Sequence, residues 1–204
     1  MNWFFIVAIS FLLPIVLLIA FVFHTLEMNN GITILEMHRF ERDVSQNLRP
    51  IFDQKDCFEV ANELKLFIEK DVDSSTINNK ESQLGPTNKD GYNGEILIAK
   101  TDVAYLPNFR CYHELVHYFK DVGRGKKVSK VYGKDPQGET RSHWEQVINY
   151  YAAAIAVPKD ALLEDIKHIH SPAENGELIR ELAHKYKQPE STVLRRIEEV
   201  SRLR

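Results

Sequence analysis

The chain has 204 residues and a formal net charge of -3, with 44% hydrophobic and 27% charged residues. This length is enough for one domain with a substantial core and too short for two large ones. The slightly negative charge argues against broad nucleic-acid binding by electrostatics alone. The two cysteines, Cys57 and Cys111, are far apart, and no C-x-x-C pair exists. They argue against a disulfide framework and a cysteine-based zinc site, and indicate free thiols in a reducing compartment.

The first segment, Trp3 to Phe23, is apolar and uncharged. Its length matches the roughly 20 residues that a helix needs to cross a bilayer, and Pro14 would kink such a helix without forbidding it. A cleaved signal peptide is the alternative, but the basic start and small-residue cleavage site that it needs are both missing. We therefore expect a transmembrane anchor over residues 1–24. The arginines that follow it favour a cytoplasmic location for the rest of a single-pass membrane protein.

Residues 25–54 are expected to form a juxtamembrane linker, with an amphipathic helix over 36–50. From Asp56, a candidate N-cap, apolar residues at helical spacing continue as far as Ile68 and predict a helix there. Residues 72–93 are polar and predict a long loop. The short apolar run from Glu95 to Ala99 is rich in β-branched residues and therefore predicts a strand.

Helical patterns cover most of the remaining chain. One helix begins at Pro107 and ends before Gly123, and a Gly- and Lys-rich surface loop follows. A strong helical pattern runs from Ser142 to Val157, and further helices are expected over 160–169, after Pro172, and from about 189 to 203. The expected fold class is therefore α+β, mainly helical with a small sheet, over residues 55–204.

The stretch His113-Glu114-Leu115-Val116-His117 reads H-E-x-x-H and lies in the first of these helices. Residues four apart share one face of a helix, so both imidazoles point toward one position, as two ligands of a tetrahedral zinc ion would. Glu114 lies about 100° around the helix, where it can act as general base on a water molecule at the metal. The alternative is a helix that carries two histidines by chance. The aromatic residues around the motif oppose this, because burying the cluster without a metal or partners would be costly.

A catalytic zinc site needs a third protein ligand. The candidates just downstream are Glu139, His143 and Glu145. Glu145 also fits a capping box with Ser142, in which its carboxylate would bond to the helix backbone, and spacing alone leaves both roles open. Asn149, one turn after Glu145, either orients the metal ligands or is a packing amide. Further candidates for holding the oxyanion of the substrate are His143, Tyr118 and Tyr150, and an ordinary loop position is the alternative for His143.

The two helices together resemble the ImmA/IrrE metallopeptidases. Those proteins carry H-E-x-x-H followed, about thirty residues later, by the pattern E-x-x-A-N-x-F-A-A-x-L-L-M-P. The matching residues are Glu145, Asn149, Ala152, Ala153, Ile155 and Pro158. The departures are Ile148, Tyr151, Ala156-Val157 and, in the first motif, Val116 at a position that is usually Gly. None of these departures removes a catalytic group, and the resemblance covers about residues 55–200.

This resemblance implies a zincin-like metallopeptidase domain in which His113, His117 and Glu145 bind Zn²⁺ and Glu114 is the base. It thereby favours the ligand role of Glu145 over the cap. It also implies that the strand over 95–99 is an edge strand that pairs with extended substrate. The substrate implied is a protein, a helix-turn-helix transcriptional repressor, and the implied origin is a bacterium, a phage or another mobile element.

The C-terminal segment from Leu182 to Ile197 is itself similar to a helix-turn-helix. Its phosphate contacts would come from Arg195, Arg196, Arg202 and Arg204. The alternative, a helical pair packed on the peptidase, fits the family better, so no direct nucleic-acid partner is expected. The function predicted is that of a membrane-anchored zinc endopeptidase. The two alternatives are a non-catalytic membrane-tethered sensing module, which the intact Glu114 opposes, and a DNA-binding regulator.

Overall fold

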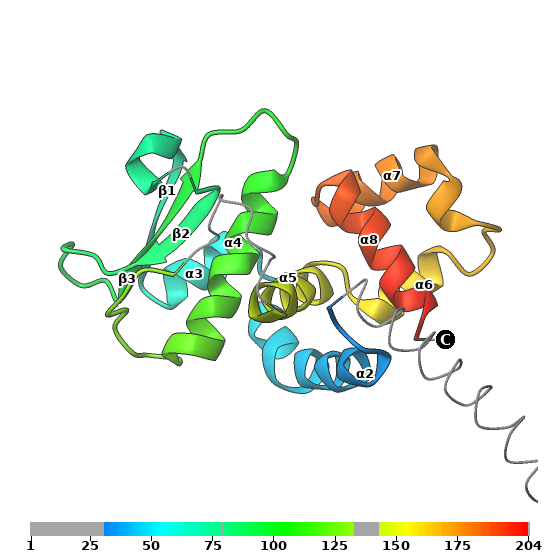
Figure 1. Cartoon of the computed structure of the whole chain (residues 1–204), viewed down its shortest axis with the longest axis horizontal. Helices are drawn as coiled ribbons and strands as arrows, with labels where there is room; N and C mark the ends of the chain where they lie inside the picture. Colours follow the sequence, from blue (N-terminus) through cyan, green and yellow to red (C-terminus); the bar gives the residue numbers. More distant parts are fainter. Residues whose placement is uncertain (1–30, 79, 133–142, 204) are drawn as a thin grey trace, which may run out of the picture.

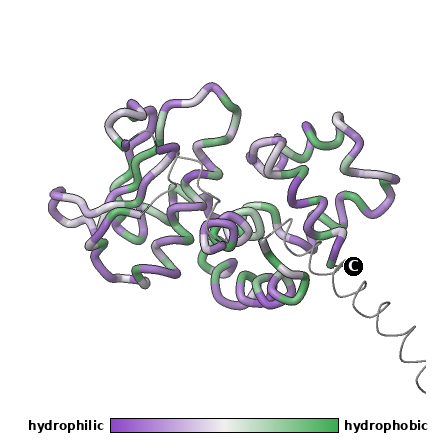
Figure 2. Tube along the Cα trace, viewed as in Figure 1, coloured by the Kyte–Doolittle hydropathy of each residue, from purple (hydrophilic) through white to green (hydrophobic). Residues whose placement is uncertain are grey.

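The computed structural model describes residues 31–203 except 79 and 133–142. A three-stranded sheet with α3 and α4 forms one side of this part of the chain, and α6, α7 and α8 form the other (Figure 1). Helix α5 lies between the two groups and contacts both α4 and α8. Hydrophobic and hydrophilic residues alternate along the helices (Figure 2), as expected for helices with one buried face.

Helix α2 (Ile34–Asp43) begins at a capping box, in which the Thr33 hydroxyl accepts a hydrogen bond from the Glu36 N–H and the Glu36 carboxylate accepts one from the Thr33 N–H. A π-helical turn and a 3₁₀ turn extend the segment to Phe52, close to the helix predicted over 36–50. The inner face of the segment packs against the main core and α5. Residues 34–52 are thus part of the structure that holds α5 in place.

The predicted transmembrane segment, residues 3–23, lies outside the described residues. In the described part of the chain, no helix is both long enough and apolar enough to cross a bilayer. The longest described α-helix, α5 (His143–Ala156), has 14 residues, against the roughly 20 that a span needs. The described structure therefore gives no support to the anchor predicted over residues 1–24, and the prediction of a single-pass membrane protein is corrected on this finding.

Helix α3 (Cys57–Glu63) begins at Asp56, as predicted, with the Asp56 carboxylate accepting hydrogen bonds from the first-turn N–H groups. It ends earlier than predicted, because Lys65 adopts a left-handed conformation with φ 56° and the chain turns into β1 (Leu66–Val72). Ile68, which the helical spacing assigns to the helix, therefore lies in a strand and pairs with Ile96 of the sheet.

The sheet has the order β1-β3-β2 among the described residues. The predicted strand is β3 (Gly94–Ala99), which is parallel to β1 and antiparallel to β2 (Ser82–Gly85). Because β3 is central, the prediction that it is an edge strand is wrong, and β2 takes that position. Strand β2 lies within the predicted loop over 72–93. It has the sequence Ser-Gln-Leu-Gly and so lacks the apolar alternation that indicates a strand.

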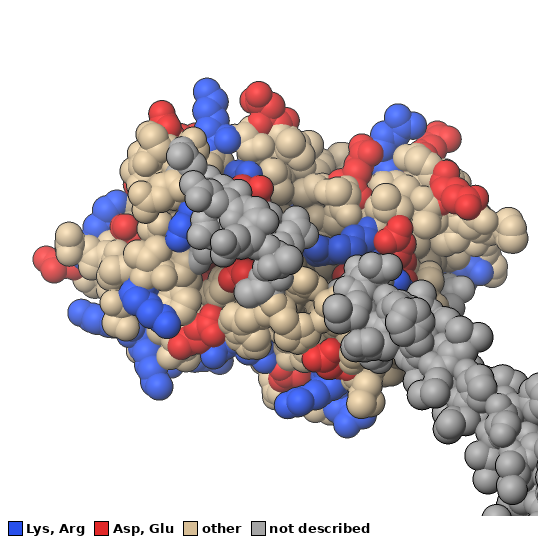
Figure 3. Space-filling model, viewed as in Figure 1, with Lys and Arg blue, Asp and Glu red and all other residues tan. Residues whose placement is uncertain are grey.

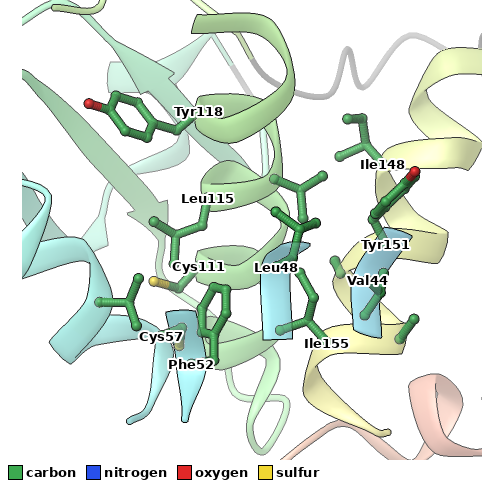
Figure 4. Packing of buried hydrophobic residues seen from close by; sticks show 14 of the residues in the cluster. Val44, Leu48, Phe52, Cys57, Cys111, Leu115, Tyr118, Ile148, Tyr151 and Ile155 are labelled. Carbon is green, nitrogen blue, oxygen red and sulfur yellow. The ribbon is translucent and has the colours of Figure 1, made fainter. Parts of the chain in front are cut away.

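Helix α4 (Leu106–His117) crosses the sheet, contacts β2 and β3, and continues as a π-helical turn over Tyr118–Val122. Figure 4 shows Cys111 and Leu115 of α4 directed toward α3. Ile148 and Ile155 of α5 enter the same core from the opposite side. All four side chains are at most 5% exposed. Because α4 and α5 share this core, residues on their adjoining faces are held at a constant separation.

The C-terminal helices are α6 (Lys159–Asp165), α7 (Gly176–Tyr186) and α8 (Glu190–Ser201), and they enclose a second hydrophobic cluster. Helix α7 begins later than expected. Pro172 forms a separate 3₁₀ turn, and Asn175 is the residue whose side chain accepts the hydrogen bond of a first-turn N–H. The mainly helical α+β class predicted from the sequence agrees with this architecture.

Candidate metal centre

The H-E-x-x-H residues form the last turn of α4, and their side chains are almost completely buried. His113 is 4% exposed, His117 is 2% exposed and Glu114 is fully buried. The two imidazole rings lie on one face with their centroids 4.9 Å apart. Helical spacing therefore directs both rings to one position, as the sequence predicts.

Glu145, in the first turn of α5, brings a carboxylate to the same position. Its Oε2 lies 3.4 Å from Nε2 of His113, and its Oε1 lies 3.3 Å from Nε2 of His117. One ligand atom from each residue can be chosen so that all three lie within 4.8 Å of one another. The edges of a tetrahedron around a zinc-sized ion with bonds of about 2.0–2.1 Å are about 3.3–3.4 Å long, so the three donors fit a metal ion.

The opposite nitrogen of each imidazole is already bonded. Nδ1 of His113 lies 3.0 Å from Oδ1 of Asn149, and Nδ1 of His117 lies 2.7 Å from Oδ2 of Asp121. The two Nε2 atoms are buried, and each lies 3.3–3.4 Å from an oxygen of Glu145. A proton on each Nδ1 leaves an Nε2 lone pair facing Glu145, which is the arrangement found around metal-binding histidines.

The carboxylate of Glu114 lies close enough to His113 and His117 to interact with their charges. Ser82 of β2 donates a hydrogen bond from its Oγ to Oε1 of Glu114 at 2.7 Å. The other carboxylate oxygen, Oε2, is buried without a hydrogen-bond partner among the residues described. Burial raises the pKa of Glu114 above its usual range, although the two histidines and Ser82 act in the opposite direction. A carboxylate in this setting accepts a proton more readily than an exposed one.

The charges at the metal cluster are coupled. Burial lowers the pKa of His117, but the neighbouring carboxylates, with Glu145 first among them, outweigh burial and raise this pKa to about 9. Burial acts to raise the pKa of Glu145, but its hydrogen bonds with His113 and His117 dominate and hold it well below the usual range. Without a metal, the imidazole of His117 therefore retains its proton at neutral pH and Glu145 retains its negative charge.

Two of the predicted site residues lie away from the cluster. His143 is at the start of α5, with its Nε2 3.3 Å from Glu36 of α2. Tyr118 is buried and donates its hydroxyl hydrogen to the carbonyl of Lys126 at 3.0 Å. Asn149 does contact a metal-cluster histidine, and Ser142, the proposed cap, lies outside the described residues.

Three neighbours of the site are missing from the sequence-based prediction. Asp121 follows His117 by four residues, so the helical spacing contained the signal for it. Ser82 lies in a stretch that looks like a loop, and only the pairing of β2 with β3 brings it to Glu114. The ring of Tyr132 lies 5.8 Å from that of His117, and no local pattern indicates this contact.

Two of the C-terminal arginines proposed for phosphate contacts, Arg195 and Arg196, are bonded within the domain. Arg196 is fully buried, with its guanidinium 2.5 Å from Glu41 of α2 and 3.3 Å from Glu199, and it also donates to the carbonyl of Val157. Arg195 donates to the carbonyl of Asn149. These two side chains therefore link α8 to the rest of the domain, and Arg196 cannot reach a DNA backbone.

Comparison with known proteins agrees with the motif and its geometry. The family model described as Peptidase_M78, IrrE N-terminal-like domain, matches residues 71–198, which is more than half of the chain and includes both α4 and α5. The comparisons with curated proteins and with solved structures gave no match. The matched region contains all three residues of the possible metal-binding triad together with Glu114. The chain therefore belongs to the Peptidase_M78 family of IrrE N-terminal-like metallopeptidase domains.

Proposed function

We propose that this protein is a zinc-dependent endopeptidase that cleaves a protein substrate. The observation that carries the proposal is the buried set of two imidazole Nε2 atoms and one carboxylate, with a second carboxylate of raised pKa directly beside it. Two nitrogen donors and one oxygen donor form a ligand set typical of catalytic zinc, which keeps one position open. The intact Glu114 favours catalysis over a purely structural metal site.

The proposed reaction assigns a separate task to each residue. Zinc bound by His113, His117 and Glu145 would lower the pKa of a water molecule and polarise the scissile carbonyl. Glu114 accepts a proton from the attacking water and passes it to the leaving amine as the C–N bond breaks. Ser82 holds one oxygen of Glu114, and the other oxygen has no hydrogen-bond partner among the described residues, so we assign the proton to it.

The substrate that we propose is a helix-turn-helix transcriptional repressor. Support for this class of substrate comes from the family resemblance. Support for cleavage of an extended segment comes from β2, which is the outer strand of the described sheet on the side of Glu114. An extended peptide can add to a sheet edge through backbone hydrogen bonds. We expect it to bind along β2 around Ser82, because the carbonyl of Leu84 is already bonded to Tyr132.

Replacing Glu114 by Gln tests the catalytic role. The variant is expected to keep the metal, because Glu114 is not a ligand, and to lose about 10²–10⁴-fold in turnover, as when a general base is removed. The measurement is zinc content together with cleavage of a repressor encoded beside the gene. The matched control is Glu69→Gln, which makes the same chemical change at an exposed position of β1. Full activity in the Glu114→Gln protein would overturn the mechanism.

The same preparation tests the ligand set. We expect Glu145→Ala to lose stoichiometric zinc and His143→Ala to retain it, because His143 faces Glu36 instead of the cluster. The opposite result, with zinc retained by Glu145→Ala and lost by His143→Ala, would show that the third ligand is assigned to the wrong residue.

A further inference from the structure

The segment after α4, residues 123–132, has a concentrated positive charge. Its cations are Arg124, Lys126, Lys127 and Lys130, and it contains no acidic residue. All four side chains are exposed, and none forms an ion pair with another described residue. This local charge contrasts with the net charge of -3 of the whole chain. We call residues 123–132 the basic strap, and Figure 3 shows Lys and Arg side chains gathered near the end of α4 from which it leaves.

The strap is held in position by the sheet and by α4. Val128 donates its N–H to the carbonyl of Asn93 at 2.7 Å, and its side chain is 5% exposed. The Val128 side chain packs so closely on Gly94 that a Cβ at that glycine would lie 2.4 Å from it. The hydroxyl of Tyr118 binds the carbonyl of Lys126. These contacts give the cations a defined place relative to β2 and β3.

The strap ends at the metal cluster. The N–H of Tyr132 donates to the carbonyl of Leu84 at 2.7 Å. Leu84 lies two residues after Ser82 on β2. The ring of Tyr132 lies 5.8 Å from that of His117, and the Lys130 ammonium lies 5.0 Å from the centre of the Tyr132 ring. The positive charges are therefore continuous with one end of the site that contains Glu114 and His117.

We propose that the basic strap binds acidic side chains of an extended protein substrate, on one side of the scissile bond only. This inference rests on the proposed peptidase function and specifies the chemistry of its substrate. The four cations, which form no ion pair with any other described residue, attract an acidic segment over about a Debye length, roughly 8 Å at physiological salt. This distance reaches the neighbouring substrate residues. We expect the preference on one side because the described strap meets the site where Tyr132 lies beside His117.

The first test uses the zinc-loaded, full-length protein and a peptide library made by digesting a bacterial proteome. Identification of the new peptide ends by mass spectrometry is expected to show Asp and Glu enriched at positions on one side of the cleaved bond. A peptide from the most frequent site and its Asn/Gln analogue are then compared, and we expect about a tenfold higher kcat/KM for the acidic peptide at low salt. Cleavage without acidic enrichment would overturn the proposal.

The second test compares charge reversal in the strap with a matched reversal elsewhere. Lys126→Glu/Lys127→Glu should abolish the preference for the acidic peptide. The control Arg42→Glu/Arg180→Glu, which changes two exposed arginines on α2 and α7, should retain it. Equal preference in both double variants would show that net charge, and not the strap, is responsible. Zinc content and circular dichroism confirm that each variant is folded.

A binding measurement separates failure of this inference from failure of the proposed function. Fluorescence anisotropy of a labelled Glu-rich peptide is measured with the Glu114→Gln protein, which needs no catalysis. Binding of the Glu-rich peptide, but not of its Gln analogue, supports the strap even when no peptide is cleaved. Equal binding of the two peptides overturns it. Tighter binding of duplex DNA, lost on reversal of Lys126 and Lys127, would assign the strap to nucleic acid and also overturn it.

Discussion

Asp121→Asn perturbs the metal site without altering its ligands. Oδ2 of Asp121 lies 2.7 Å from Nδ1 of His117, and the indole N–H of Trp144 lies 3.4 Å from the same oxygen. Asn is nearly isosteric with Asp and can still accept the Nδ1 hydrogen bond, so the ring of His117 stays in place. The negative charge that strengthens the bond is removed, which isolates the electrostatic part of the contact.

The expected loss is 10–100-fold in zinc affinity, or about 1.4–2.7 kcal/mol, the range found when partners of metal-binding histidines are changed. Charge-assisted hydrogen bonds are roughly twice as strong as neutral ones, and this one is short and part-buried, so the charge matters here. Asn149 makes the neutral counterpart of this bond to His113 at 3.0 Å. Its replacement by Ala is expected to cause a smaller loss of affinity.

The assay is competition for zinc between the protein and a chromophoric chelator. The wild type, Asp121→Asn, Asn149→Ala and the surface control Asp160→Asn are measured at one pH. Turnover of Asp121→Asn should recover largely when zinc is raised above its weakened Kd, because the base and the ligands are intact. A Kd for Asp121→Asn within twofold of the wild-type value would refute the assignment of Asp121 to the metal site.

Two further predictions follow from the buried charges. The pKa of His117 in the metal-free site is raised to about 9, so zinc must displace a proton, and its affinity should rise about tenfold per pH unit between pH 7 and 8.5. The stability of the metal-free protein changes with pH in the opposite direction. Protonated His117 stabilises the fold fully below the unfolded pKa of about 6.5, and this stabilisation is lost as the pH rises through about 9. Chelator competition and thermal unfolding of the EDTA-treated protein across this range test both effects, and a flat pH profile of zinc affinity would contradict the first. Arg196→Met leaves the carboxylates of Glu41 and Glu199 without their buried cation and should cost about 3–5 kcal/mol in urea unfolding. The double variant Arg196→Met/Glu41→Gln should recover part of that loss, and a single-variant loss below about 1 kcal/mol would contradict the role of Arg196 in joining α2 to α8.

Much of the candidate site could be predicted because its geometry is local. The spacing of His113 and His117 is the repeat of a helix, so their shared face follows from secondary structure alone. Glu145 is one turn into a helix whose apolar pattern is strong, and the family resemblance assigned it to the metal. Asp121 was equally accessible from its spacing to His117, four residues away.

The predictions of secondary structure differ from the observed fold where the local sequence pattern fits two structures or gives no signal. Leu64 to Ile68 fits a helical repeat, yet the chain leaves the helix at Lys65, because pairing of β1 with β3 outweighs a propensity worth only tenths of a kcal/mol. Strand β2 has almost no apolar signal and exists through its pairing with β3. The membrane prediction rested on hydrophobicity over residues 3–23, and no described helix supports a bilayer span.

The sequence by itself determined the helical repeat that aligns the two histidines, the catalytic class to which they belong and the mainly helical character of the chain. Tertiary structure alone decided which polar groups surround them. Ser82 reaches Glu114 through strand register, and Tyr132 reaches His117 because the basic strap is bonded to the edge of the sheet. Arg196, a candidate for binding phosphate in the sequence, is buried between two carboxylates. The physical reason is that a helical repeat depends on neighbours within one turn, whereas these contacts join residues that only the packed core brings together.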